Sequence, residues 1–163
     1  MKVVIMAGGK GTRISSLFHD IPKPMIKIDD RPVLEHEIEC LRRQGFDDII
    51  ITVSHLGHVI MDYFGDGSRI SPATGKPFGV KIEYFNEEVP LGNAGALYKL
   101  RDKLTDDFLL LNADAIFDID FNRFVNFHKE SGGLVTLFTH PNSHPYDSGL
   151  IIADDSHKVY KRR

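Results

Sequence analysis

Cysteine is almost absent from this sequence, since Cys40 is the only one among its 163 residues. An internal disulfide is therefore impossible. Cys40 lies in a segment whose apolar residues recur with helical spacing, and this setting favours a buried structural thiol over a nucleophile.

An excess of basic charge and a long hydrophobic run are missing as well. The formal net charge is −3 at pH 7, whereas a general binder of nucleic acid carries a basic surplus. The apolar run from Met1 to Met6 is too short for a signal peptide or a membrane span. We therefore expect a cytoplasmic protein without nucleic-acid or membrane partners, and the length predicts one domain.

Apolar segments typical of strands alternate with segments of helical periodicity. The strands are expected at 1–6, 48–54, 80–85, 108–111 and 134–138, with a closing hairpin at 150–152 and 159–160. The helices are expected at 32–44, ending at Gly45, and at 57–64, 94–104 and 121–130. Such alternation predicts an α/β fold, a Rossmann-like three-layer sandwich around a mainly parallel, partly mixed sheet. Ligands bind such sheets at the carboxyl ends of the strands.

A glycine-rich turn follows the first strand, with Gly8, Gly9 and Gly11 close together. Consecutive backbone N–H groups in such a turn bind anions, and Arg13 adds a cation suited to phosphate. The dinucleotide fingerprint is excluded because Ile14 stands where it needs glycine, and no Gly-Lys-Ser/Thr tripeptide exists for a P-loop. Taken alone, the turn is also compatible with a tight connection that binds nothing.

A second cation lies close by in the chain. Lys23 stands between Pro22 and Pro24, which stiffen the backbone around it. An incidental surface turn would explain this tripeptide alone. In combination with the glycine turn and Arg13, it favours a phosphate-binding site.

Four motifs together resemble the sugar-1-phosphate nucleotidyltransferases, which make nucleotide sugars. Met6-Ala-Gly-Gly-Lys-Gly-Thr-Arg13 and Pro22-Lys-Pro24 are similar to the family's G-G-x-G-T-R and P-K-P. Leu91-Gly-Asn-Ala-Gly-Ala-Leu97 resembles its L-G-T-A-G-A-L segment, and Asn112-Ala-Asp114 its metal-aspartate segment. They stand in the family's order along the whole chain, and this resemblance implies the nucleotidyltransferase type of α/β fold.

The resemblance also implies roles for particular residues. Arg13 would neutralise the departing pyrophosphate, Lys23 the α-phosphate region, and Asp114 would coordinate Mg²⁺. The nucleotide would be held by Ala7, Gly8, Gly9, Gly11, Thr12, Glu87, Gly92 and Asn93. Positioning and charge neutralisation suffice for this chemistry, which needs no protein nucleophile. For Asp114 a role in a turn or a helix cap is the alternative.

Glu87 bears on the choice of base. A carboxylate only accepts hydrogen bonds, which suits the two adjacent donors of guanine better than uracil or thymine. GTP is therefore the favoured substrate, and finer resemblances, among them His140-Pro-Asn-Ser-His-Pro-Tyr-Asp147, favour mannose or heptose 1-phosphate as acceptor. A cytidylyl-, uridylyl- or thymidylyltransferase remains the alternative. Two departures from the family pattern, Ile14 to Phe18 and Asn93 in place of threonine, bear on the nucleotide pocket.

Relatives of this kind extend well beyond 163 residues. We expect residues 1–163 to form the nucleotide-binding domain and to lack the C-terminal part that binds the acceptor sugar. Without that part, strand edges of residues 1–163 are expected to be exposed. Exposed strand edges tend to associate, so we predict a homo-oligomer. A nucleotide-binding or regulatory module without turnover stays open as the alternative function.

Overall fold

The structure is a computed structural model, and it describes residues 1–9, 20–89, 91–141 and 149–162. The chain divides into two compact units, Met1–Asn122 and Arg123–Arg163. Each unit is described separately below, because the candidate site is built from the first one.

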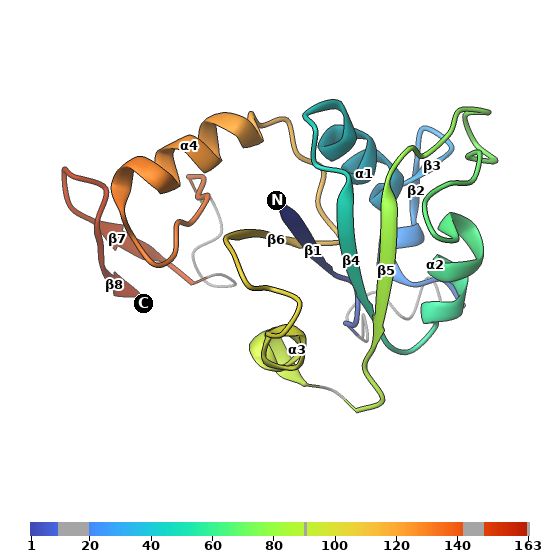
Figure 1. Ribbon diagram of the computed structural model, residues 1–163, viewed down its shortest axis with the longest axis horizontal. Coiled ribbons are helices and arrows are strands. Elements are labelled where there is room, and N and C mark those ends of the chain that lie inside the picture. The colour runs from blue at the N-terminus through green and yellow to red at the C-terminus, as the bar shows by residue number, and fades with distance from the viewer. Residues whose placement is uncertain (10–19, 90, 142–148, 163) are drawn as a thin grey trace. The chain divides into compact units, whose positions relative to one another are not determined.

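A parallel sheet of four strands forms the centre of the first unit (Figure 1). The strands are β1 (Lys2–Met6), β4 (Asp48–Val53), β5 (Lys81–Asn86) and β6 (Phe108–Asn112), in the spatial order β5-β4-β1-β6. In this register Val4 lies between Ile50 of β4 and Leu110 of β6. All pairings within the sheet are parallel, which confirms the α/β fold expected from the alternating segments.

In the described parts of the connections between these strands there are three α-helices. They are α1 (Val33–Arg43), α2 (Gly57–Phe64) and α3 (Gly92–Leu100). The short elements before α1 are a 3₁₀ turn, η1 (Lys23–Met25), and the antiparallel pair β2 (Lys27–Ile28) and β3 (Arg31–Pro32). The expected end of α1 is confirmed, because Gly45 follows it with a φ of +87° that a residue with a Cβ rarely adopts.

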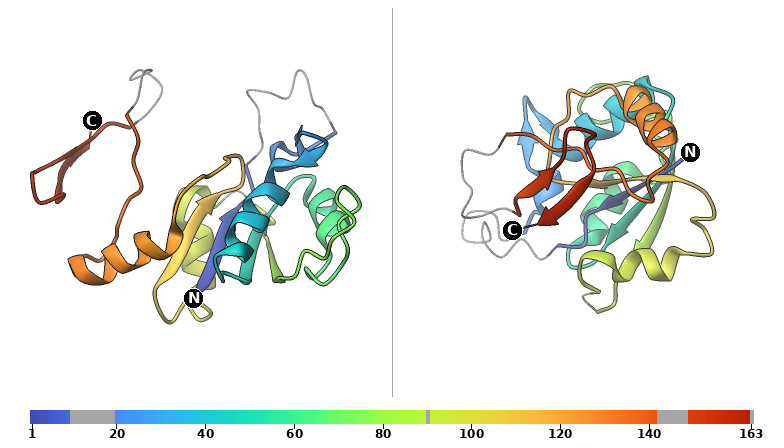
Figure 2. Two further views of the ribbon diagram at one scale, coloured as in Figure 1. Left: turned by 90° about the horizontal axis from the view of Figure 1, so that it is seen from above. Right: turned by 90° about the vertical axis from the view of Figure 1, so that its left-hand side faces the viewer.

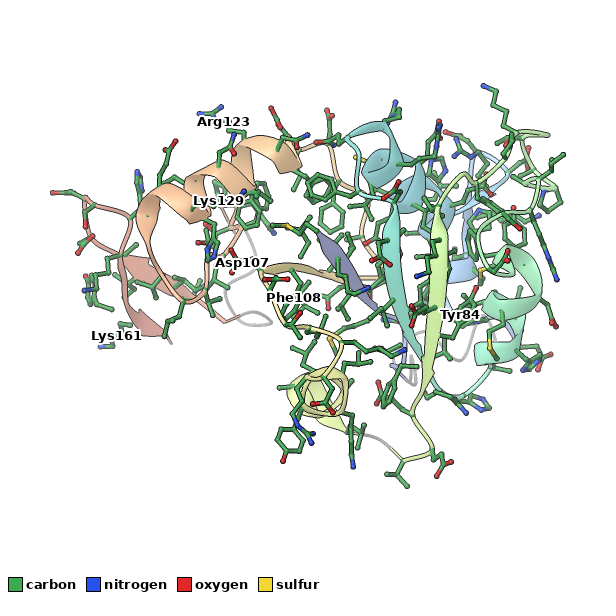
Figure 3. All side chains as sticks on the ribbon, viewed as in Figure 1. Tyr84, Asp107, Phe108, Arg123, Lys129 and Lys161 are labelled. Atoms are coloured by element: carbon green, nitrogen blue, oxygen red, sulfur yellow. The ribbon has the colours of Figure 1, made fainter. Side chains whose placement is uncertain are left out.

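The hydrophobic core lies on both faces of the sheet, with α1 and α3 on opposite sides (Figure 2). On one face, Val4 and Ile50 are buried against Leu100 of α3. Phe108, at the start of β6, packs on the same cluster (Figure 3). On the other face, Tyr84 of β5 donates a hydrogen bond to the carbonyl of Gly65, directly after α2, at 2.7 Å. This arrangement follows from right-handed crossovers between parallel strands.

One side of α1 holds the segment that follows β6. Cys40 is buried, and its Sγ lies 3.7 Å from the carbonyl oxygen of Phe117. Gln44 donates to the carbonyl of Ile119 at 3.0 Å and accepts from the backbone N–H of Phe121 at 2.7 Å. The structural role expected for Cys40 agrees with this packing. These bonds fix the course of the chain from the end of β6 to Phe121.

The second unit contains most of α4 (Phe121–Ser131) and an antiparallel hairpin of β7 (Ile151–Ala153) and β8 (Val159–Arg162). The hairpin confirms the one expected at 150–152 and 159–160. The strand expected at 134–138 is wrong, since these residues form no regular element and Leu134 is 100% exposed. A strand requires a hydrogen-bonded neighbour, and none of the described strands pairs with this segment.

Candidate active site

The loops that follow the four parallel strands meet at one edge of the sheet. Backbone hydrogen bonds continue the strand pairing into these loops. They run from Ala7 to Thr52 at 2.9 Å, from Glu87 to Val53 at 2.7 Å and from Ala113 to Met6 at 3.2 Å. Residues from sequence positions as distant as 7 and 113 are thereby brought to the same place.

The strand order makes one position along this edge special. From β1 the chain moves to β4 and β5 on one side, then crosses to β6 on the other side. The direction in which successive strands are added therefore reverses between β1 and β6, and ligands of open α/β sheets bind at the carboxyl ends of the strands at such a point. The loop after β1 begins with Ala7 and Gly8, and the loop after β6 contains Asp114.

The beginning of the glycine loop is attached to the neighbouring strand. Ser54, which directly follows β4, donates its hydroxyl to the carbonyl oxygen of Gly8 at 2.6 Å. Ala7 is buried, whereas Gly9 is exposed. Gly11, Thr12 and Arg13, for which the sequence predicts contacts with phosphate, lie outside the described residues. The sequence analysis missed Ser54, although a polar residue at the carboxyl end of an apolar strand is a usable signal.

The carboxyl group of Glu87 occupies the space beside Gly8. Glu87 is only 9% exposed, and one of its oxygens would lie 2.7 Å from a Cβ added to Gly8. The other oxygen accepts a hydrogen bond from the backbone N–H of Leu91 at 3.3 Å. Gly92 then begins α3 with a φ of +69°, and Asn93 lies in the same helix. Glu87 thus connects the glycine loop with the start of α3.

We expect Gly8→Ala to destabilise the fold by about 1 kcal/mol, because the new methyl group displaces Glu87 from its hydrogen bond to Leu91. Gly9→Ala is the matched control, since a Cβ there meets nothing within 4 Å, and its effect should stay within about 0.5 kcal/mol. Urea unfolding of both variants measures the difference. Equal stabilities for the two variants would contradict the close contact between Gly8 and Glu87.

Lys23 and Asp114 face each other across the site. Lys23 begins η1, whose turn is closed by hydrogen bonds from Met25 to Pro22 and from Ile26 to Lys23. Its Nζ lies 3.8 Å from a carboxylate oxygen of Asp114, and the two side chains are 30% and 52% exposed. Such a long, hydrated ion pair contributes about 0–1 kcal/mol to stability. Both charges are consequently available to a ligand at small cost.

A further carboxyl group, Glu37 on α1, lies behind this pair and was missed by the sequence analysis. It is 1% exposed, and neither of its oxygens has a hydrogen-bond partner among the described residues. Burial, reinforced by the negative charge of Asp114, raises the pKa of Glu37 to about 9. A signal was present, because Leu34, Glu37, Ile38 and Leu41 share the i, i+3, i+4, i+7 spacing of a buried helix face.

The metal-binding side chains at this edge of the sheet suit one type of metal ion, magnesium. In the described part of the chain no group of three or more acidic, histidine or cysteine side chains could enclose a metal. Magnesium binds through one or two carboxylates and takes its other ligands from phosphates and water. Asp114 offers a carboxylate with about half of its surface free. The site therefore suits a cation that arrives with a phosphate ligand.

Comparison with known proteins identifies this arrangement. Residues 2–161 match the family model described as Nucleotidyl transferase. This chain belongs to the nucleotidyl transferase family. It is 39% identical over 173 residues to a UTP–glucose-1-phosphate uridylyltransferase of Synechocystis, a match that covers 98% of this chain. It is also 39% identical over 123 residues to a D-glycero-α-D-manno-heptose 1-phosphate guanylyltransferase of Campylobacter jejuni, which covers 76% of this chain and 52% of that relative.

The fold agrees with solved structures of this nucleotidyl transferase type. The crystal structure of HddC from Yersinia pseudotuberculosis superposes with a TM-score of 0.73 at 26% identity, covering 99% of this chain and 68% of that one. A second crystal structure of that protein is a complex with GMP-PN. The chain spans 42% of the length of the Synechocystis relative. Among the described residues, no helix is long and apolar enough to cross a membrane.

Proposed function

We propose that this chain binds a nucleoside triphosphate with Mg²⁺ and is the nucleotide-binding part of a sugar-1-phosphate nucleotidyltransferase. In this reaction a sugar phosphate oxygen attacks the α-phosphorus, the bond to the β-phosphate oxygen breaks, and pyrophosphate leaves. The observation that carries the proposal is the convergence of the glycine loop, Lys23 and Asp114 at the point where the strand order reverses.

The proposed chemistry requires neutralisation of charge on a crowded phosphate chain. The glycine-rich sequence of the loop favours backbone N–H groups that bind phosphate oxygens, and Lys23 supplies a cation that is only weakly engaged with Asp114. Arg13 is proposed to pair with the departing pyrophosphate, as its place in the motif suggests. These fixed charges stabilise the transition state because they need no rearrangement during the reaction.

Asp114 is the proposed ligand of Mg²⁺. When bound, the ion would screen the charge of the triphosphate and of the attacking sugar phosphate. The contribution of the chain is to hold the carboxylate at the edge of the sheet, where α1 fixes the segment that follows. Lys23 would add a second positive charge close to Asp114.

GTP is the proposed nucleotide, with mannose or heptose 1-phosphate as acceptor. One oxygen of Glu87 is used by Leu91, and the other lies beside Gly8. An acceptor at this position suits the neighbouring donors of guanine. Relatives named mannose-1-phosphate guanylyltransferases support this choice, for example the catalytic subunit beta of Danio rerio at 32% identity. The uridylyltransferase relative makes UTP and glucose 1-phosphate the alternative pair.

The test is a pyrophosphate-release assay with all four nucleoside triphosphates and a panel of sugar 1-phosphates. Calorimetry with the same nucleotides and Mg²⁺ is run in parallel. Release of pyrophosphate that requires both substrates and the metal is the expected result. Tight nucleotide binding without release in any pairing would favour the alternative, a nucleotide-binding module without turnover. Absence of nucleotide binding would refute both.

Glu87→Gln provides a test of the base. We expect the unmodified chain to bind GTP more tightly than UTP, and the substitution to narrow this gap by roughly tenfold, about the value of one charged hydrogen bond. Glu88→Gln is the matched control, because Glu88 is the exposed neighbour and should leave the ratio unchanged. Calorimetric affinities measure both. Equal or tighter binding of UTP by the unmodified chain would refute guanine as the base.

A further inference from the structure

Two buried carboxyl groups on α1 have opposite surroundings. Glu35 is 3% exposed and accepts hydrogen bonds from Tyr63 at 2.7 Å and Ser71 at 2.8 Å, with Arg31 beside it at 3.4 Å. Glu37, two residues later, is equally buried, yet neither of its oxygens has a partner in the described part of the chain. Glu35 therefore holds α1, α2 and the loop after α2 together, whereas Glu37 makes no such bond.

Stability does not account for Glu37. An unpartnered buried carboxyl group is costly, and an apolar side chain of similar size at the same place is commonly neutral or stabilising. The rest of this helix face is apolar, with Leu34, Ile38 and Leu41 fully buried. A polar group retained in such surroundings is expected to serve a site.

The direction of Glu37 follows from its neighbours on the helix. Glu37, Cys40 and Gln44 are spaced i, i+3 and i+7 and share one face of α1. Cys40 and Gln44 contact the segment from Phe117 to Phe121, so Glu37 faces the earlier part of that segment, towards the end of β6. The charge of Asp114 reaches it there.

We propose that Glu37 is a positioning residue for Asp114, which it supports through one buried water hydrogen-bonded to both side chains. This inference rests on the proposed function, in which Asp114 binds the magnesium ion. A donor behind the carboxylate restricts its rotation and directs its free oxygen outward. Such supporting groups are typically worth 10- to 100-fold in metal affinity. Buried waters of this kind are common where two or more polar partners hold them.

The test compares Glu37→Gln, which keeps a polar side chain of the same size, with Glu37→Met, which keeps only the volume. Binding of Mn²⁺, as a paramagnetic substitute for Mg²⁺, is measured by electron paramagnetic resonance on the whole chain, and the melting temperature is measured for the same samples. We expect Glu37→Met to weaken Mn²⁺ binding about tenfold while melting at the same or a higher temperature. Glu37→Gln should bind Mn²⁺ within about twofold of the unmodified chain, because its amide can hold the same water.

Asp114→Asn and Glu39→Gln complete the design. Asp114→Asn should abolish Mn²⁺ binding, and an unchanged affinity in this variant, or no binding by the unmodified chain, would overturn the metal site of the proposed function itself. Glu39 lies on the same helix and is paired with Arg31. Its variant Glu39→Gln is the control and should bind Mn²⁺ as tightly as the unmodified chain.

Once Asp114 is confirmed as the metal ligand, unchanged Mn²⁺ binding in Glu37→Met would overturn the positioning role. Joint loss of affinity and stability in Glu37→Met would show a structural role. Equal losses of Mn²⁺ affinity in Glu37→Gln and Glu37→Met would show that Glu37 itself binds the metal. Each of these results overturns the inference.

Discussion

Replacing Lys23 by alanine should lower the rate of pyrophosphate release by at least about 100-fold and leave the melting temperature almost unchanged. The first expectation follows because a preorganised charge at a reacting phosphate is typically worth about 3–4 kcal/mol in the transition state. The second follows from the geometry. The ion pair of Lys23 with Asp114 is 3.8 Å long and partly hydrated, and such pairs contribute little to folding.

Lys27→Ala is the matched control for this experiment. Lys27 lies four residues later in β2 with an exposed side chain, and its removal changes the net charge by the same amount. Its rate should stay within about twofold of the unmodified chain, since only general electrostatics are altered. Calorimetry with Mg²⁺ and nucleotide accompanies the rate measurement, so that binding and turnover are separated. A near-native rate for Lys23→Ala would exclude Lys23 from the reaction.

The sheet was predictable mainly because its two inner strands, β1 and β4, are buried on both faces. Their sequences are continuous apolar runs, such as Ile49–Ile51. The segment 134–138 has the same composition but forms no strand. Composition indicates that a segment can pair, whereas pairing also depends on a neighbouring edge that the local sequence does not contain. The hairpin of β7 and β8 was predictable because its two partners are close in the chain.

The candidate site was predictable where short sequence motifs identify its residues. The glycine turn, Lys23 and Asp114 were found from such motifs, and the structure brings Lys23 within 3.8 Å of Asp114. Ser54 and Glu37 were missed because their significance comes from contacts across the fold. Ser54 matters through the carbonyl of Gly8, and Glu37 through its burial behind Asp114. Helical spacing could have placed Glu37 on the buried face, but only the structure shows that neither of its carboxyl oxygens has a hydrogen-bond partner among the described residues.

The unusual state of Glu37 predicts how stability depends on pH. The pKa of Glu37 is raised to about 9 by burial and by the charge of Asp114, from an ordinary value of 4.5. Between these values the folded chain keeps the proton while the unfolded chain has released it. The stability linked to this proton is therefore complete below pH 4.5 and declines as the pH rises to about 9. The decline amounts to at most about 1.4 kcal/mol for each pH unit.

Glu37→Gln removes this titration and keeps a polar side chain of the same size, so its free energy of unfolding should decline less steeply between pH 6 and 9. Urea unfolding at intervals of half a pH unit should show the two curves separating by roughly 1 kcal/mol for each unit. Glu39→Gln is the control, because Arg31 lowers the pKa of Glu39 and this carboxyl group is ionised in both states over that range. Its curve should run parallel to that of the unmodified chain. Parallel curves for Glu37→Gln as well would mean that Glu37 is ionised in the folded protein, with a cation or a donor beside it that lowers the cost of its burial.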